Sequence, residues 1–387
     1  MRILINAVSV KKRGGGIFQI ATNFILKSIE NDSNEITWFY IVSEDLHEVL
    51  QQYSFSKEKN YFVYPTQPNF TGSYYKVRKG LKLIEKSLKP QVVYSLASPS
   101  YFSFKAPEVM RFANAWITNP NKYAYSTLSV KGRVHNKLYT INQKRLMRKR
   151  RFFITQSETV KNGILSNVET EAYNVKVISN VLPAIYLDKR DDLLLNQKND
   201  KDIIYIACVA APNPHKNLDI LPSVLKYLRD EHGIENAVFL TTLPDDSSLF
   251  IQLKQELTLM NLENRVVNYG YCSQEKLIEL YSKCEICFMP TLLETFSATL
   301  LEAMFFNLAI VTSDFDFNRE VVGDSALYHQ PMDAKDAADK LAFLIKDETY
   351  RGKLKSKMSP HLKRYSSFDN YMEETISFLA KVAEKTN

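Results

Sequence analysis

Short apolar runs alternate with longer amphipathic stretches along the whole chain. The runs at 2–8, 92–95 and 152–157 are mostly hydrophobic and end at polar or turn residues, which is typical of strands buried in a parallel sheet. Between such runs, stretches such as 71–89 place apolar residues at helical spacing and end before a proline. This alternation fills both halves, with a polar, weakly periodic segment at 183–201 between them. The pattern therefore predicts an α/β protein with two doubly wound domains.

One strand-to-helix junction in the second half concentrates the candidate chemistry. The strand-like run 286–289 leads through a turn into an apolar helical run, which Ser297 can cap at its start and Asn307 can end in a left-handed conformation. Glu294 then lies just before the helix and Glu302 within it. Between them, free N–H groups of the first helical turn form an anion site. The residues concerned are Phe296, Ser297, Ala298 and Thr299.

This junction suits a ligand that carries both hydroxyl groups and phosphate. The two carboxylates bind hydroxyl groups, and the helix end binds phosphate. A nucleotide-sugar supplies sugar hydroxyls, a diphosphate and ribose hydroxyls. The alternative is that Glu294 is an acid that favours the helix dipole and Glu302 a solvated neighbour.

The same stretch resembles the Glu-x7-Glu signature of glycosyltransferase family 4, whose members are retaining enzymes with the GT-B fold. Glu294, Phe296 and the run Glu302-Ala303-Met304 match that signature, whereas Thr295 and Ser297 stand where the family has glycines. The resemblance is strongest over about 201–330. It implies two Rossmann-like domains facing a cleft, with a C-terminal helix that crosses back to the first domain.

The domain bounds implied by this resemblance divide the chain near residue 182. The acceptor-side domain is expected at 1–182, together with the returning helix at about 366–387. The donor-binding domain is expected at 183–365.

Several further positions resemble functional positions of the family. Lys216 matches the lysine of a basic pair that clamps the donor diphosphate, but Ala210 and Ala211 stand in the loop without the usual arginine, so Lys216 is expected to act with His215. Gly270 and Tyr271 resemble the element that contacts the nucleotide base. On the acceptor side, Gly15 and Gly16 are expected to line the cleft. Asn114 lies where many members carry a histidine, and is either a sugar contact or a turn residue.

The charge of the chain is concentrated in one acid-free block. The net charge is +7, from 50 basic and 43 acidic residues, and no Asp or Glu occurs between 109 and 157. The block favours an anionic membrane surface as partner, with a solvated helix face as the alternative, and no nucleic acid is expected because no nucleic-acid-binding motif accompanies it. Its eleven bases are Arg111, Lys122, Lys131, Arg133, Lys137, Lys144, Arg145, Arg148, Lys149, Arg150 and Arg151.

Neither a metal nor a disulfide framework is expected. Cys284 and Cys287 form an isolated CxxC pair in an apolar strand, which indicates buried thiols. Asp314 and Asp316 form an Asp-x-Asp sequence that we interpret as loop and cap acids. No apolar run approaches a membrane span and the chain opens directly on a strand, so a cytoplasmic protein is expected, peripheral at the inner face of the plasma membrane.

The function implied by the resemblance is retaining, metal-independent hexosyl transfer from a UDP- or GDP-linked sugar. The nucleotide-sugar is then a substrate and no cofactor is needed. The acceptor would be a glycan or a lipid-linked glycan of cell-surface polysaccharide or lipopolysaccharide biosynthesis. Glu294 would hold the sugar, Lys216 the leaving diphosphate and Glu302 the ribose. Two alternatives remain: a sugar-nucleotide epimerase of the same fold, and a non-catalytic protein that binds a sugar-nucleotide or RNA.

Overall fold

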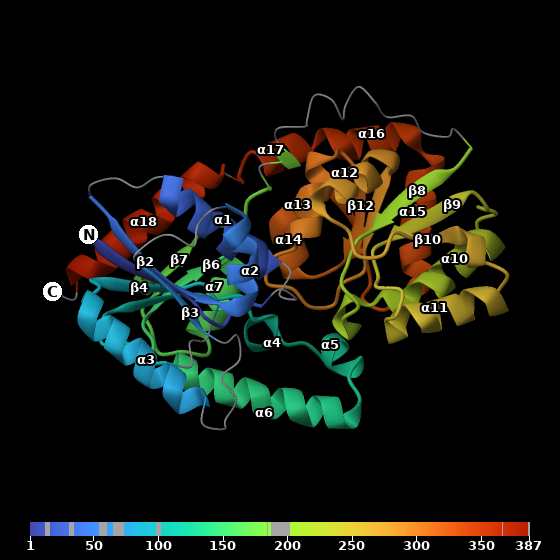
Figure 1. Cartoon of the computed structure of the whole chain (residues 1–387). Coiled ribbons are helices and arrows are strands. Elements are labelled where there is room, and N and C mark those ends of the chain that lie inside the picture. The colour runs from blue at the N-terminus through green and yellow to red at the C-terminus, as the bar shows by residue number, and fades with distance from the viewer. Residues whose placement is uncertain are drawn as a thin grey trace. The chain divides into compact units, whose positions relative to one another are not determined.

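The chain folds into two compact units, each built around one parallel sheet (Figure 1). The computed structural model describes residues 1–11, 16–30, 35–53, 60–64, 73–97, 102–183, 185–186, 202–365 and 367–385. The first unit consists of Met1–Thr118, Asn136–Ser179 and Asp369–Asn387, and the second of Asn119–His135 and Asn180–Phe368.

The first unit contains a seven-stranded sheet in the order β3-β2-β1-β4-β5-β6-β7, with every neighbouring pair parallel. Its strands are β1 (Arg2–Ala7), β2 (Thr37–Ser43), β3 (Tyr61–Tyr64), β4 (Val92–Ser95), β5 (Glu108–Arg111), β6 (Phe152–Thr155) and β7 (Val175–Val177). Its helices are α1 (Gly16–Glu30), α2 (Glu44–Leu50), α3 (Ser73–Leu88), α4 (Ala115–Thr118), α7 (Glu158–Leu165) and α18 (Phe368–Lys385), with short 3-10 turns at Gln51–Tyr53 and Ala172–Asn174.

Helices cover both faces of this first sheet, as its alternating buried residues require. On one face, Val77 and Leu81 of α3 pack against Leu4 and Val93. On the other face, the Phe24 ring of α1 lies edge-on to the rings of Tyr94 and Tyr371, the latter from α18. Figure 1 accordingly shows α18 above the strands of this sheet and α3 below them.

The second unit contains a six-stranded parallel sheet in the order β10-β9-β8-β11-β12-β13. Its strands are β8 (Ile204–Cys208), β9 (Ala237–Thr241), β10 (Val266–Asn268), β11 (Ile286–Met289), β12 (Ala309–Ser313) and β13 (Ala326–His329). Its helices are α5 (Lys122–Ser126), α10 (Leu221–Asp230), α11 (Ser248–Leu259), α12 (Gln274–Lys283), α13 (Ala298–Phe305), α14 (Asp316–Val322), α15 (Ala334–Lys346), α16 (Glu348–Ser356) and α17 (Met358–Leu362). The described residues of this unit also contain the 3-10 turns η5 (Pro214–Lys216), η6 (Leu218–Ile220) and η7 (Glu263–Arg265).

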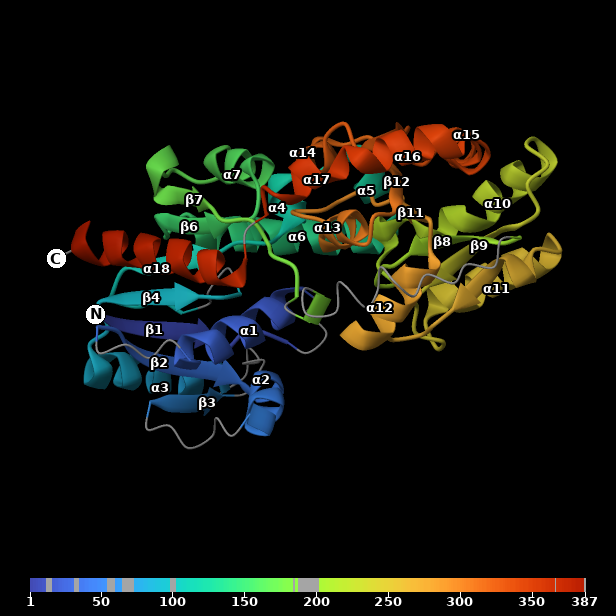
Figure 2. The same ribbon diagram turned by 90° about the horizontal axis from the view of Figure 1, so that it is seen from above.

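Two apolar layers enclose this second sheet. One layer joins α10, α11 and α15 to side chains such as Ile206 and Phe288, and the other joins α12 and α13 to the alternate side chains, such as Ala207 and Met289. In Figure 2, α12 and α15 lie on opposite sides of β8 and β11. The predicted α/β architecture of two doubly wound sheets is therefore confirmed.

The observed division of the chain differs from the predicted one in one segment. The second unit begins at Asn180, close to the predicted start at 183, and α18 belongs to the first unit as expected of the terminal helix. However, Asn119–His135 also belongs to the second unit, although it lies within the first half of the sequence. This inserted segment carries α5 and the start of α6 (Val130–Met147), which returns to the first unit. Most of the predicted linker 183–201 lies outside the described residues, but Tyr186 is fully buried and is core rather than linker.

The acid-free basic block divides between buried and exposed residues. Arg150 is buried and its Nε lies 2.6 Å from the Glu108 carboxylate, while Arg111 is buried and its Nε donates to the Tyr371 hydroxyl at 3.3 Å. These two side chains therefore belong to the core of the first unit and not to a binding surface. Among the other nine, Lys144 is half-buried and the rest are exposed. In the described part of the chain, no helix is both long and apolar enough to cross a membrane.

Candidate functional site

The predicted site residues Lys216 and Glu294 lie at the point where the second sheet reverses its strand order. The chain runs from β8 outward to β9 and β10, then returns to place β11 on the other side of β8. The loops that leave the carboxyl ends of β8 and β11 therefore diverge, and this is the position where open α/β sheets bind ligands. Lys216 follows β8 and Glu294 follows β11.

Lys216 is positioned by a tight turn after β8. Pro214–Lys216 forms η5, and Asn217 ends it in a left-handed conformation with a φ of 57°. Such a conformation is tolerated by asparagine better than by most residues. The Lys216 side chain reaches the loop after β11, the strand beside β8, where its Nζ donates to Glu294 Oε1. The two side chains are only 16% and 14% exposed, so the pair is largely shielded from water.

The loop and helix after β11 follow the predicted geometry. Ser297 caps α13, since its Oγ accepts a hydrogen bond from Leu300 N at 3.3 Å, and Asn307 adopts a left-handed conformation with a φ of 55°. Thr299 Oγ1 donates to Val209 O at 3.3 Å, which ties the start of α13 to the β8 loop. The Phe296 ring packs edge-on against Tyr365 in the core, so Phe296 has only its backbone to offer a ligand. The first-turn N–H groups of α13, around exposed Ala298, have no partner within the helix.

Glu302 is held by two tyrosines that the sequence reasoning did not identify. The Tyr281 hydroxyl donates to Glu302 Oε2 at 2.7 Å, and the Tyr186 hydroxyl donates to Oε1 at 3.4 Å. Burial raises the pKa of Glu302 to about 7, against the opposing effect of these two hydroxyl groups. Both carboxylate oxygens thus accept hydrogen bonds from the protein itself, and the ribose contact predicted for Glu302 stays a prediction.

His215 is placed beside Lys216, but it carries no charge at neutral pH. Burial, together with the neighbouring Lys216 charge, lowers the pKa of His215 to about 4. Its backbone carbonyl accepts hydrogen bonds from Leu292 N at 2.8 Å and from Thr291 Oγ1 at 3.4 Å. His215 can therefore donate a hydrogen bond to a phosphate, while the positive charge at this turn comes from Lys216.

The other predicted site residues belong to other elements of the two units. Gly270 follows β10 at the sheet edge with a φ of 67°, and Tyr271 beside it is 86% exposed. In the first unit, Gly16 begins α1, and Gly15 lies outside the described residues. Asn114 Oδ1 accepts from Trp116 N at 3.1 Å at the start of α4, which fits the turn interpretation of that residue.

The acidic pair and the cysteine pair have structural explanations. Asp314 accepts two hydrogen bonds from Arg319, at 2.6 and 2.8 Å, and Asp316 begins α14. Cys284 and Cys287 are buried thiols, as predicted. Within the described residues, no group of three or more His, Cys, Asp or Glu side chains is arranged to hold a metal ion.

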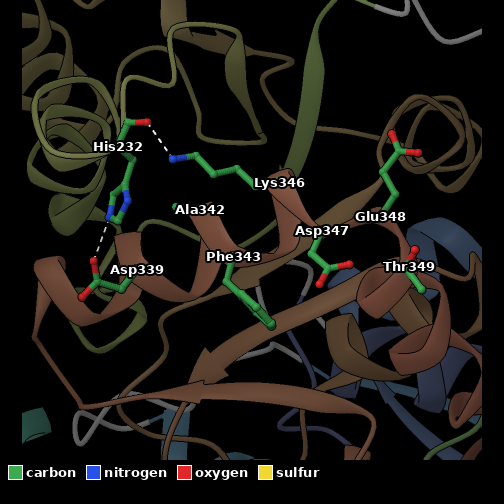
Figure 3. A pocket seen from close by; sticks show the side chains of 8 residues that line it. All are labelled: His232, Asp339, Ala342, Phe343, Lys346, Asp347, Glu348 and Thr349. Atoms are coloured by element: carbon green, nitrogen blue, oxygen red, sulfur yellow. Dashed lines mark hydrogen bonds and ion pairs between the residues drawn. The ribbon is translucent and has the colours of Figure 1, made fainter.

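A separate hollow of about 720 Å³ lies along α15 and the start of α16 (Figure 3). It is lined in part by His232, whose Nε2 lies 2.7 Å from Asp339 Oδ1, and by Lys346, whose Nζ donates to His232 O at 2.9 Å. None of the predicted site residues lines it. We assign this hollow no role in the site.

Comparisons with known proteins agree with the fold. Residues 190–361 match the family described as "Glycosyl transferases group 1". The structure resembles Anabaena Alr3699/HepE, solved in complex with UDP and glucose, with a TM-score of 0.69 and 16% identity over 98% of this chain and 100% of that one. The fold is therefore GT-B, as the sequence resemblance implied.

Two curated relatives match part of the chain. The O-antigen chain mannosyltransferase RfbU of Salmonella typhimurium is 26% identical over 59% of this chain and 59% of its own length. The phosphatidylinositol N-acetylglucosaminyltransferase GPI3 subunit of Saccharomyces cerevisiae is 27% identical over 58% of this chain and 48% of its own length. The chain thus matches less than two thirds of either relative.

Proposed function

We propose that this chain, whose residues 190–361 match the family described as "Glycosyl transferases group 1", moves a hexosyl group from a nucleotide-sugar to a glycan or lipid-linked acceptor with retention of configuration. The observation that carries this proposal is the meeting of Lys216 and Glu294 beside the N-terminus of α13. A cation and an N–H-rich helix end suit a diphosphate, and the adjacent carboxylate suits sugar hydroxyls. The name of RfbU supports a growing surface polysaccharide as the acceptor.

In the proposed mechanism, the donor diphosphate replaces Glu294 as the partner of Lys216. Negative charge grows on the diphosphate as the glycosidic bond breaks, and Lys216 with the α13 N–H groups stabilises it. Glu294, released from Lys216, then accepts hydrogen bonds from hydroxyls of the transferred sugar, and Glu302 accepts from the ribose. A UDP- or GDP-linked donor fits this arrangement, and UDP and glucose are what the HepE complex contains.

The proposal is tested by incubating the protein with a panel of UDP- and GDP-sugars and acceptors and measuring released nucleoside diphosphate. Transfer requires an acceptor and yields a glycosylated product. Conversion of one nucleotide-sugar into another without acceptor would instead identify an epimerase. Nucleotide binding without turnover across the panel would identify a non-catalytic binding protein.

We expect transfer to survive removal of divalent metal. Lys216 and backbone N–H groups supply the positive charge that a metal would otherwise bring to the diphosphate. Initial rates measured with excess EDTA should match those measured without it. Loss of activity that Mn²⁺ or Mg²⁺ restores would contradict this mechanism and make Asp314 and Asp316 candidate metal ligands.

We also propose that the protein binds an anionic membrane surface through α6 and the exposed bases that follow it, Arg148, Lys149 and Arg151. Apolar side chains at helical spacing are left exposed on this helix: Val130, Val134, Leu138 and Ile141 are 77%, 56%, 65% and 61% exposed. Exposed bases accompany them, and the helix contains no acid. A helix with exposed apolar residues and many bases favours the interface of an anionic bilayer, where a lipid-linked acceptor would be found.

Replacing Arg148, Lys149 and Arg151 by Gln should weaken sedimentation with phosphatidylglycerol-containing vesicles. Each base near such a surface contributes about 1 kcal/mol, so three should change the partition by roughly 100-fold. Arg150 is left intact because it pairs with buried Glu108. A control variant with Lys254, Lys353 and Lys363 changed to Gln has the same net charge and should sediment like the parent. Equal loss in both variants, or no sedimentation of the parent, would remove the membrane proposal.

A further inference from the structure

Two asparagines of the inserted segment hold the backbone of the loop that carries Glu294. Asn119 Nδ2 donates to Glu294 O at 2.7 Å, and Asn121 Nδ2 donates to Leu292 O at 2.8 Å. Both asparagines lie more than 170 positions away in the sequence. These two carbonyls belong to Glu294 itself and to Leu292, which lies two positions before it.

The inserted segment is itself firmly anchored on the second unit. Asn121 Oδ1 accepts from Ala124 N at 2.9 Å and so caps α5, which leaves the amide nitrogen of the same side chain for Leu292. The Tyr123 ring lies edge-on to Phe315 with a centroid distance of 6.0 Å, and Ser126 Oγ donates to Met332 Sδ at 3.4 Å. Helix α5 also contacts η5, the turn that carries Lys216.

The opposite side of the Glu294 loop is fixed by the Lys216 turn. Leu292 N donates to His215 O, and Thr291 Oγ1 donates to the same carbonyl. Leu292 and Leu293 are buried, so the loop cannot shift without exposing them. Within this arrangement, the Asn119 bond fixes the peptide from which the Glu294 side chain projects.

We propose that Asn119 and Asn121 are positioning residues for sugar transfer, which set the placement of Glu294 relative to Lys216. The proposal rests on the proposed function of that pair. Catalytic groups must be held close to the productive geometry, and a displacement of about 1 Å can cost roughly 100-fold in rate. An amide that donates to the Glu294 carbonyl controls the carboxylate without touching the substrate.

The test uses Asn119→Asp and Asn121→Asp, which keep the side-chain shape and replace the N–H donor by an oxygen. In Asn121→Asp the cap of α5 is preserved, because aspartate caps helices as well as asparagine does. Each variant should lower kcat by roughly 10- to 100-fold while the donor KM stays near that of the parent. Asn264→Asp, on an exposed asparagine of η7, is the matched control and should behave like the parent.

Two further measurements separate positioning from general destabilisation and from failure of the proposed function. In a Glu294→Gln background, Asn119→Asp should lower kcat no further, because both changes act through one carboxylate. The rate of Lys216 acetylation, measured by peptide mass spectrometry, should rise in Asn119→Asp and not in Asn264→Asp, and this readout needs no turnover. A parent-like kcat with an unchanged acetylation rate would overturn the proposal. So would losses of kcat that add in the double variant, or losses of kcat that a lowered Tm explains. If no donor is turned over but Lys216 acetylation responds as expected, the proposed function fails and the positioning stands.

Discussion

Glu294→Gln should lower kcat for sugar transfer by roughly 10- to 150-fold, which corresponds to the loss of a charge-assisted hydrogen bond of about 1.5–3 kcal/mol. The contacts that Glu294 makes with the transferred sugar tighten as the bond breaks, so the loss should appear in kcat more than in the donor KM. Lys216→Ala should also lower kcat, because Lys216 is the predicted cation for the leaving diphosphate.

The same Glu294→Gln change should strengthen binding of the nucleoside diphosphate product. Lys216 Nζ bonds to the Glu294 carboxylate, so a diphosphate must displace that carboxylate to reach Lys216. A neutral amide competes less well for the ammonium group. We expect roughly 3- to 10-fold tighter UDP or GDP binding, equivalent to about 1 kcal/mol for a largely shielded ion pair.

Initial-rate kinetics and isothermal titration calorimetry with UDP and GDP measure the two effects on the same protein. Glu263→Gln, at an exposed position in η7, is the matched control and should leave both unchanged. Parent-like kcat, or nucleotide binding weaker than in the parent, would show that Glu294 does not compete with the donor for Lys216. A simple folding defect cannot produce lower turnover together with tighter product binding.

Local chemistry allowed much of the second unit to be predicted from the sequence. Ser297 and Asn307 act at the ends of α13 through their own side-chain and backbone preferences, so their roles could be recognised from neighbouring residues alone. Lys216 and Glu294 could each be placed after a strand. Parallel strands bring their carboxyl ends to one edge, which makes the two loops neighbours once the strand order is known.

The residues that sequence reasoning missed act over long separations on partners without a sequence signal. Asn119 and Asn121 bind backbone carbonyls, which every residue has, so nothing in the Glu294 loop indicates them. Tyr186 lies within the polar segment predicted as a linker, yet its ring is fully buried beside Phe306. Arg150 belongs to a basic run that reads as solvated, and its burial depends on Glu108 of a strand more than 40 residues earlier. Such partners are fixed by tertiary structure.

Glu302→Gln should make the protein more stable at alkaline pH and weaken donor binding at the same time. Burial raises the pKa of Glu302 from its ordinary 4.5 to about 7, so between these values the folded protein keeps a proton that the unfolded chain has lost. The free energy of unfolding therefore falls as pH rises through this window, and is flat above it. A glutamine does not titrate, so the substitution removes this pH-dependent loss of stability.

The expected gain follows from the size of the shift. At about 1.4 kcal/mol per pKa unit, Glu302→Gln should stabilise the protein by roughly 3 kcal/mol at pH 8 and hardly at all near pH 4. Glutamine can still accept a hydrogen bond from one of Tyr281 and Tyr186 and donate to the other. The donor KM should nevertheless rise, because the carboxylate assigned to the ribose has lost its charge.

Urea unfolding at several pH values measures the free energy of unfolding, and initial-rate kinetics measure the donor KM. Tyr281→Phe is the matched variant, since it removes a hydrogen bond that lowers the pKa of Glu302, and its stability should go on falling to a higher pH than that of the parent. If Glu302→Gln keeps the parent's pH slope, the carboxyl group is not the group that titrates in this window. If stability rises at alkaline pH while the donor KM is unchanged, Glu302 is a buried structural acid held by Tyr186 and Tyr281. The ribose contact must then come from another residue of the second unit, because a charge removed from the binding site itself would have weakened the donor complex.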